Sequence, residues 1–157
     1  MKKILRDLSE KDKFSIILFS VKVLAWSPKE KLDLNELNQF NEDEPANVIA
    51  KEDYIVPVTK ENIEEATKFV DSLSTYGGTN IMGGLRNGLK LARLGKKEMN
   101  SDAPHESMLI FLTDGQPNSE ESDPAKITAN VKEDNKCVTI FSLGFGYDVD
   151  MNFLKKL

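Results

Sequence analysis

Thr79 and Asp114 are the two residues whose side chains and positions suggest ligand chemistry. Asp114 directly follows the apolar run of residues 108–112, and Thr79 lies in a glycine-rich loop before an amphipathic stretch. In open α/β sheets, ligands bind outside the carboxyl ends of the strands, so we expect both side chains at that rim. A carboxylate and a hydroxyl, completed by water, are hard oxygen ligands suited to magnesium, manganese or calcium. Two protein ligands alone predict a weak metal site.

Both residues also have a purely structural interpretation. A threonine that follows two glycines is commonly a helix N-cap, and Asp-Gly is a common turn dipeptide. For Asp114, the position directly after a buried strand favours the ligand interpretation. The two loops contain further residues that would support a site, and these are Gly77, Gly78, Asn80, Thr113 and Gly115.

Apolar runs and helical spacing predict the elements that position these loops. Strands are predicted at residues 13–20, 23–26, 108–112 and 138–143, the second of them as an antiparallel edge. Helices are predicted at residues 2–8, from the Thr59 cap to residue 73, at residues 81–94, from Asp123 to about residue 135, and from about Asp148. Strands that alternate with helices imply parallel strands joined by right-handed crossovers. The predicted fold class is α/β, an open, doubly wound, mostly parallel sheet with helices on both faces.

The remaining segments are predicted as loops or packing residues. Residues 27–53 form a polar, acidic insertion, and residues 95–106 form a solvated loop. Trp26 is expected to pack rather than to recognise a ligand. The single cysteine, Cys137, opens an apolar run and is predicted to be a buried free thiol. The length of 157 residues fits one domain.

Composition argues against several classes of function. The net charge of −5 makes nucleic acid an unfavourable partner. The longest apolar run is too short to span a bilayer, and no signal-peptide pattern follows Met1. The only histidine, His105, has no nucleophile beside it, so serine or cysteine hydrolase chemistry is not predicted.

Two alternatives to a metal-assisted binding site stay open. One is a nucleotide-binding or hydrolytic α/β enzyme that uses residues 144–146 (Gly-Phe-Gly). That motif lacks a third glycine at the required spacing, and the chain contains no Gly-Lys-Ser or Gly-Lys-Thr. The other alternative is a structural scaffold that holds no metal. Magnesium-dependent partner binding would distinguish the binding module from the scaffold, and nucleotide turnover would reveal the enzyme.

Residues 77–81 (Gly-Gly-Thr-Asn-Ile) and 112–115 (Leu-Thr-Asp-Gly) together resemble the von Willebrand factor type A domain family. The metal-ion-dependent adhesion site of that family combines an Asp-x-Ser-x-Ser motif after the first strand with a threonine and an aspartate in two such loops. The resemblance implies a Rossmann-like fold and assigns Thr79 and Asp114 as metal ligands. It is closest to inter-alpha-trypsin inhibitor heavy chains, through residues 17–20, 58–62, 78–81, 111–115, 130–132, 143–146 and 148–154.

The same resemblance predicts that residues 1–157 are a single partial domain, truncated at both ends. The family's first strand with its Asp-x-Ser-x-Ser motif, and its last strand and helix, are expected outside this segment. Residues 7–11 match the motif only in part and are interpreted as a helix end and a turn. The first strand would lie in the centre of the sheet, between residues 13–20 and 108–113. Without it, a divalent cation is expected to bind weakly or not at all.

The resemblance also implies a function. A heavy-chain type A domain is expected to be a non-enzymatic module that contacts a protein or extracellular-matrix ligand through its metal-bearing face. The parent protein is expected to be secreted and extracellular, and to be linked to hyaluronan and to the light chain of a protease-inhibitor complex. These attachments are assigned to other parts of the complex. Residues 1–157 are therefore expected neither to inhibit a protease nor to catalyse a reaction.

Overall fold

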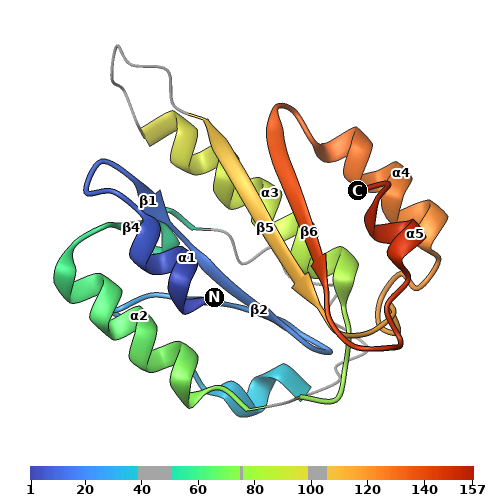
Figure 1. Ribbon diagram of the computed structural model, residues 1–157, viewed down its shortest axis with the longest axis horizontal. Helices are drawn as coiled ribbons and strands as arrows, with labels where there is room; N and C mark the ends of the chain where they lie inside the picture. Colours follow the sequence, from blue (N-terminus) through green and yellow to red (C-terminus); the bar gives the residue numbers. More distant parts are fainter. Residues whose placement is uncertain (39–50, 75, 99–105) are drawn as a thin grey trace.

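The computed structural model describes residues 1–38, 51–74, 76–98 and 106–157 (Figure 1). The helices are α1 (Lys2–Asp7), α2 (Lys60–Ser72), α3 (Ile81–Glu98), α4 (Pro124–Asp134) and α5 (Met151–Leu154), with 3-10 turns η1 (Leu34–Asn38) and η2 (Glu52–Tyr54). The strands are β1 (Lys13–Phe14), β2 (Ile16–Phe19), β3 (Val23–Trp26), β4 (Val56–Pro57), β5 (Ser107–Thr113) and β6 (Val138–Gly144). None of the described helices is both long and apolar enough to cross a membrane.

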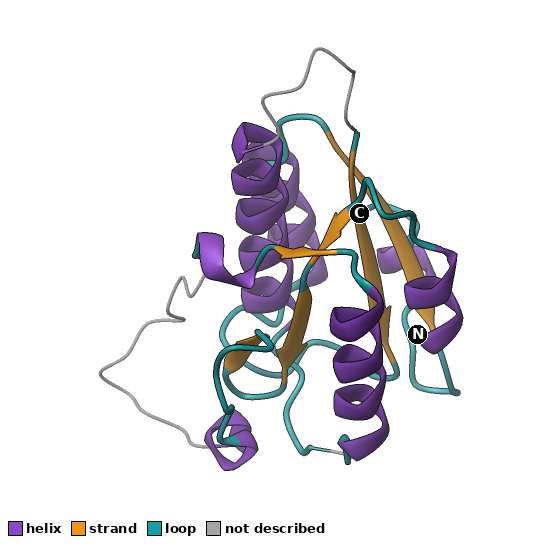
Figure 2. Ribbon diagram, turned by 90° about the vertical axis from the view of Figure 1, so that its left-hand side faces the viewer, coloured by secondary structure: helices purple, strands orange, loops and turns teal. Residues whose placement is uncertain are grey.

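The strands form three separate two-stranded sheets. β5 and β6 are parallel, β2 and β3 are antiparallel, and the short strands β1 and β4 are antiparallel. Helices lie on both sides of the strands, as Figure 2 shows. The α/β class and a parallel pair are therefore present, whereas the predicted open, doubly wound, mostly parallel sheet is not formed by the described residues.

The gap in the sheet lies between β2 and β5. These strands run side by side in the same direction, and α3 packs against both (Figure 1). Within the described residues each has one hydrogen-bonded neighbour, β3 for β2 and β6 for β5. This is the place at which the family resemblance predicts an additional central strand.

Three predicted element bounds were wrong. The strand expected at residues 13–20 is broken at Ser15, whose hydroxyl donates to the Tyr54 carbonyl at 2.6 Å, and its two halves pair with different partners. The loop expected at residues 95–106 begins later, because α3 continues to Glu98, and residues 99–105 lie outside the described part. The last helix begins at Met151, because the Asp150 side chain caps it by accepting the backbone amides of Asn152 and Phe153.

The other bounds follow local signals in the sequence. The Thr59 hydroxyl accepts the Asn62 amide and starts α2, as predicted. The Asp123 carboxylate accepts the Ala125 amide and starts α4, with Pro124 in the first turn. β3, β5 and β6 lie at the predicted positions, and β3 is antiparallel to its neighbour. Because each cap involves residues close in sequence, the starts of α2 and α4 could be predicted from the local sequence alone.

Trp26 packs in the core, whereas Cys137 does not. The indole of Trp26 stacks with the rings of Phe14 and of Phe69 in α2, at ring-centroid distances of 6.1 and 5.7 Å. The prediction of a buried thiol at Cys137 was wrong, because the residue is exposed in a turn with φ of 87°. The side chain of Asn135 closes this turn by hydrogen bonds to both backbone groups of Val138, so the chain enters β6 only after Cys137.

Candidate metal-binding site

The loop that carries Thr79 is fixed to the carboxyl end of β2. The Gly78 amide donates to the Ser20 hydroxyl at 2.9 Å, and the Asn80 amide donates to the Ser20 carbonyl at 2.7 Å. A Cβ atom placed on Gly78 would lie 2.6 Å from the backbone nitrogen of Val21. Gly78 is therefore required for the close approach of the two backbones, and Thr79 is held at the end of β2.

The N-cap of α3 is Asn80 and not Thr79. The Asn80 side-chain oxygen accepts the Gly83 amide at 2.8 Å, while its amide group donates to the Val21 carbonyl at 3.1 Å. The capping role considered for Thr79 is therefore filled by its neighbour. Within the described residues the half-buried Thr79 makes hydrogen bonds only through its backbone, and its hydroxyl is left for a ligand.

Asp114 is the first residue after β5. The turn that follows is tied by Thr113, whose hydroxyl accepts the Gly115 amide at 3.4 Å and donates to the Gly115 carbonyl at 3.2 Å. The exposed Asp114 carboxylate makes no hydrogen bond or ion pair with any other described residue. The Thr113 hydroxyl makes the hydrogen bonds that the turn-forming interpretation would assign to Asp114. The Asp114 carboxylate is therefore also available to a ligand.

Asn118 joins the two loops. Its side-chain oxygen accepts a hydrogen bond from the Thr79 backbone amide at 2.8 Å. Its backbone amide donates to the Thr79 carbonyl at 3.2 Å. A Cβ atom placed on Gly115 would lie 3.5 Å from the Thr79 hydroxyl, so the turn at Asp114 is beside Thr79. The loop is further attached to α3 by an ion pair of 2.6 Å between Arg86 and Glu120. Sequence reasoning missed Asn118, because an asparagine in a polar loop has no distinguishing spacing.

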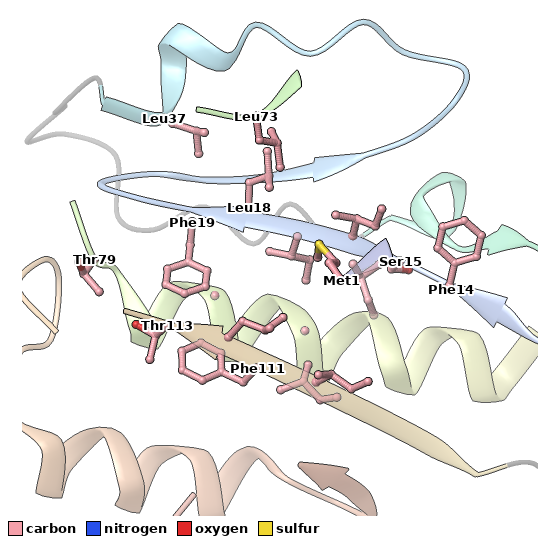
Figure 3. A pocket seen from close by; sticks show the side chains of 18 of the residues that line it. Met1, Phe14, Ser15, Leu18, Phe19, Leu37, Leu73, Thr79, Phe111 and Thr113 are labelled. Carbon is pink, nitrogen blue, oxygen red and sulfur yellow. The ribbon is translucent and has the colours of Figure 1, made fainter. Parts of the chain in front are cut away.

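The two candidate ligands lie at one end of a cavity of about 520 Å³ between β2 and β5. Figure 3 shows Thr79 and Thr113 at the same end of this cavity, near the rings of Phe19 and Phe111. Asp114 lines that end as well. The predicted convergence of Thr79 and Asp114 at the carboxyl ends of the strands agrees with this placement.

The donor set suits a weakly held hard cation. Thr79 and Asp114 supply one hydroxyl and one carboxylate, and magnesium is commonly held by one or two carboxylates with several retained waters. Among residues outside the gaps, no three or more His, Cys, Asp or Glu side chains are grouped so that they could hold a metal ion. Thr79 and Asp114 would thus be two ligands at most of such an ion, and their role as ligands stays a prediction.

The Gly-Phe-Gly segment at residues 144–146 has a structural role at this rim. The Phe145 amide donates to the Thr113 carbonyl at 2.9 Å, which extends the pairing of β5 and β6 by one step. Gly146 has a φ of 91°, and a Cβ atom on it would lie 3.8 Å from the Asp114 carbonyl. The segment lies beside the candidate metal ligands.

The family profile of the von Willebrand factor type A domain matches residues 1–157. The chain belongs to the von Willebrand factor type A domain family. This type A domain is 32% identical to human (Homo sapiens) inter-alpha-trypsin inhibitor heavy chain H4 over 156 residues. The aligned residues cover 99% of the chain and 14% of heavy chain H4. It is 33% identical over 156 residues to the bovine (Bos taurus) heavy chain H3, and the aligned residues cover 99% of the chain and 15% of that protein.

A third relative is the bovine heavy chain H1, which is 31% identical over 154 residues, covering 98% of the chain and 14% of that protein. The type A domain thus spans about one-seventh of the length of the relatives it matches. The predicted resemblance to this family and to its heavy-chain members is confirmed.

Proposed function

We propose that this type A domain is a non-enzymatic binding module in which Thr79 and Asp114 share a divalent cation and present it to a protein or extracellular-matrix ligand. The observation that supports the proposal is the Asn118 contact to both backbone groups of Thr79, which holds the two loops together. Both candidate side chains lack other partners within the described residues. Gly77, Gly78, Asn80, Thr113 and Gly115 are proposed as residues that support the two loops.

The cation would link the module to its ligand. With two protein ligands, most positions around magnesium, manganese or calcium are filled by water. An acidic side chain of a partner can replace one of these waters and bind the cation directly. Thr79 and Asp114 would then position the ion, and the surrounding rim would contact the rest of the partner.

The parent protein is proposed to be secreted, as an extracellular heavy-chain-like protein linked to hyaluronan and to an inhibitor light chain. Those partners are assigned to regions other than residues 1–157. The type A domain alone is therefore expected to leave trypsin fully active and to show no affinity for hyaluronan. A metal-free scaffold is the alternative, and it differs in having no magnesium dependence.

Metal binding tests the first half of the proposal. Calorimetric titration should give weak magnesium binding that is lost in Asp114→Asn and retained in Glu133→Gln, a control at an exposed carboxylate near the end of α4, before β6 begins. A tight, stoichiometric site that Asp114→Asn abolishes would show that further protein ligands exist. Binding that is unaffected by Asp114→Asn would refute the assigned site.

Ligand contact tests the second half. An immobilised peptide that carries glutamate, and a matched peptide with glutamine, should be compared in magnesium and in EDTA. The proposal predicts retention on the glutamate peptide only, only with magnesium, and only with Asp114 intact. Because the chain carries a net charge of −5, simple charge attraction to the acidic peptide is unfavourable. Equal retention in EDTA would favour the metal-free scaffold.

A further inference from the structure

The turn after β5 contains the single Asp-Gly pair of the chain, Asp114 and Gly115. In Asp-Gly and Asn-Gly pairs the side-chain carbonyl carbon is open to attack by the next backbone amide, because glycine has no Cβ atom to shield its nitrogen. The chain also has a single Asn-Gly pair, Asn87 and Gly88. Asparagine is the more labile residue of the two, so the sequence alone ranks Asn87 first.

The fold protects Asn87. This residue lies in α3 with an exposed fraction of 0%, and its side-chain amide donates to the Gly83 carbonyl at 3.0 Å. A helical conformation directs the Gly88 amide toward the carbonyl four residues earlier and away from the Asn87 side chain. Attack of this amide on Asn87 would therefore require α3 to open.

Asp114 has none of these restraints. It is exposed, it lies outside the helices and strands, and its carboxylate makes no hydrogen bond or ion pair with the rest of the described chain. Among the described residues the Gly115 amide donates to the Thr113 hydroxyl alone, at 3.4 Å, which is longer than usual for an N–H donor. Both groups that would react are therefore weakly held.

The residue that follows an aspartate decides whether its side chain can be attacked. Asp123 precedes Pro124, which has no amide proton to lose. Asp148 is exposed like Asp114, but it precedes Val149, whose branched side chain shields the backbone nitrogen. Asp148 is therefore an internal control that matches Asp114 in exposure and differs in the following residue.

We propose that Asp114 is a site of spontaneous isomerisation to isoaspartate in the folded chain. The Gly115 nitrogen forms a bond to the side-chain carbonyl carbon of Asp114, and the amide proton leaves with the carboxyl hydroxyl as water. Water then adds to the cyclic imide that results. Cleavage between the nitrogen and the backbone carbonyl carbon of Asp114 gives isoaspartate, whereas cleavage at the side-chain carbon restores aspartate. The reaction needs no reactant other than water.

Isomerisation would change the candidate metal site. In the product the backbone runs through the former side chain of Asp114, which lengthens the turn by a methylene group, and the free carboxylate stands directly on the Cα atom. The carboxylate thus leaves its place at the rim, where the proposed function needs it. The reaction itself involves no cation, so its absence would leave the proposed function untouched.

Isoaspartate can be measured in peptides of the unaltered chain with isoaspartyl methyltransferase, after incubation in EDTA at neutral pH. In the folded chain we expect isoaspartate to accumulate at Asp114 and to stay at background at Asp148, while Asn87 retains its amide. In urea, which opens α3, Asn87 should react first. Isoaspartate at Asp114 that does not exceed the level at Asp148, or the same order of reaction in urea as in the folded chain, would overturn the proposal.

Two matched variants test the role of the glycine. Gly115→Ala shields the attacking nitrogen, and its Cβ atom would lie 3.5 Å from the Thr79 hydroxyl, an ordinary contact that the fold should accept. Isoaspartate at Asp114 should then fall to the level at Asp148. Gln116→Ala, at the next, exposed position, should leave the reaction unchanged. If Gly115→Ala fails to fold, the comparison of Asp114 with Asp148 in the unaltered chain decides. Undiminished isoaspartate in a folded Gly115→Ala chain would overturn the proposal.

Discussion

The backbone amide of Thr79 donates to the side-chain oxygen of Asn118, and the backbone amide of Asn118 donates to the Thr79 carbonyl. This reciprocal contact joins residues that are 39 positions apart and belong to the loops after β5 and before α3. Neither hydrogen bond uses the Thr79 hydroxyl. The contact therefore fixes the position of Thr79 and leaves its hydroxyl without a hydrogen bond among the described residues.

Replacement of Asn118 should loosen this contact. In Asn118→Ala the Thr79 amide loses its acceptor, and a hydrogen bond of this kind contributes about 1 kcal/mol to local stability. Exchange of the Thr79 amide should become about fivefold faster. Asn130→Ala, at an exposed position of α4, is the control and should leave that amide unchanged. Equal exchange rates in the two variants would mean that the contact does not hold the loop.

Gly78 and Gly77 should respond differently to alanine. A Cβ atom on Gly78 would meet the backbone of Ser20 and Val21 at 2.6–2.9 Å, whereas one on Gly77 has nothing within 4 Å. Because backbone cannot move aside as a side chain can, Gly78→Ala should lower the free energy of unfolding by about 1–3 kcal/mol. Gly77→Ala should be close to neutral. Urea unfolding of both variants at low protein concentration measures the difference, and equal stability would contradict the close approach.

Tyr54 should make the fold sensitive to alkaline pH. Burial raises the pKa of Tyr54 above its ordinary value, and the nearby Glu30 carboxylate, which accepts its hydroxyl at 3.3 Å, raises this pKa further. The stabilisation is therefore complete below the ordinary tyrosine pKa of about 10 and is lost as pH rises through the folded-state pKa. In an absorbance titration, Tyr54→Phe should remove the tyrosine step at highest pH. Persistence of that step in Tyr54→Phe would contradict this account.

The gap between β2 and β5 should make residues 1–157 marginally stable on their own. Within the described residues β2 and β5 each leave one apolar edge unpaired, which favours pairing between molecules. A domain's net stability is only about 5–15 kcal/mol. We expect a broad thermal transition and association that increases with concentration, measured by circular dichroism and sedimentation velocity. A sharp two-state transition of a soluble monomer would show that β2 and β5 are closed in another way.

Elements defined by local chemistry could be predicted from the sequence. The caps at Thr59 and Asp123 start α2 and α4 through hydrogen bonds to amides two or three residues away. The apolar runs of β5 and β6 are long enough to be recognised as strands. The prediction that both strands are buried was wrong, because Met108, Phe141 and Leu143 are 60, 49 and 43% exposed. The neighbouring positions of Thr79 and Asp114 could be predicted because each follows a recognisable turn or strand end. Their role as metal ligands stays a prediction.

Features that depend on distant partners could not be predicted in this way. The break at Ser15 depends on Tyr54, which is 39 positions away, and the Asn118 contact depends on a loop equally distant. Cys137 has an apolar run after it, yet the Asn135 side chain closes the turn so that the thiol faces solvent. In each case a tertiary or turn contact overrides the local pattern.

Paramagnetic broadening by manganese tests the assigned site most directly. Nuclear magnetic resonance spectra of the chain should be recorded with increasing manganese, and the amides that broaden first should be identified. The account predicts broadening centred on Thr79, Asp114 and Gly115, which disappears in Asp114→Ala and persists in Glu133→Ala, at an exposed position near the end of α4. Broadening centred instead on the acidic residues 120–123, or unchanged in Asp114→Ala, would contradict the claim that Thr79 and Asp114 hold the cation.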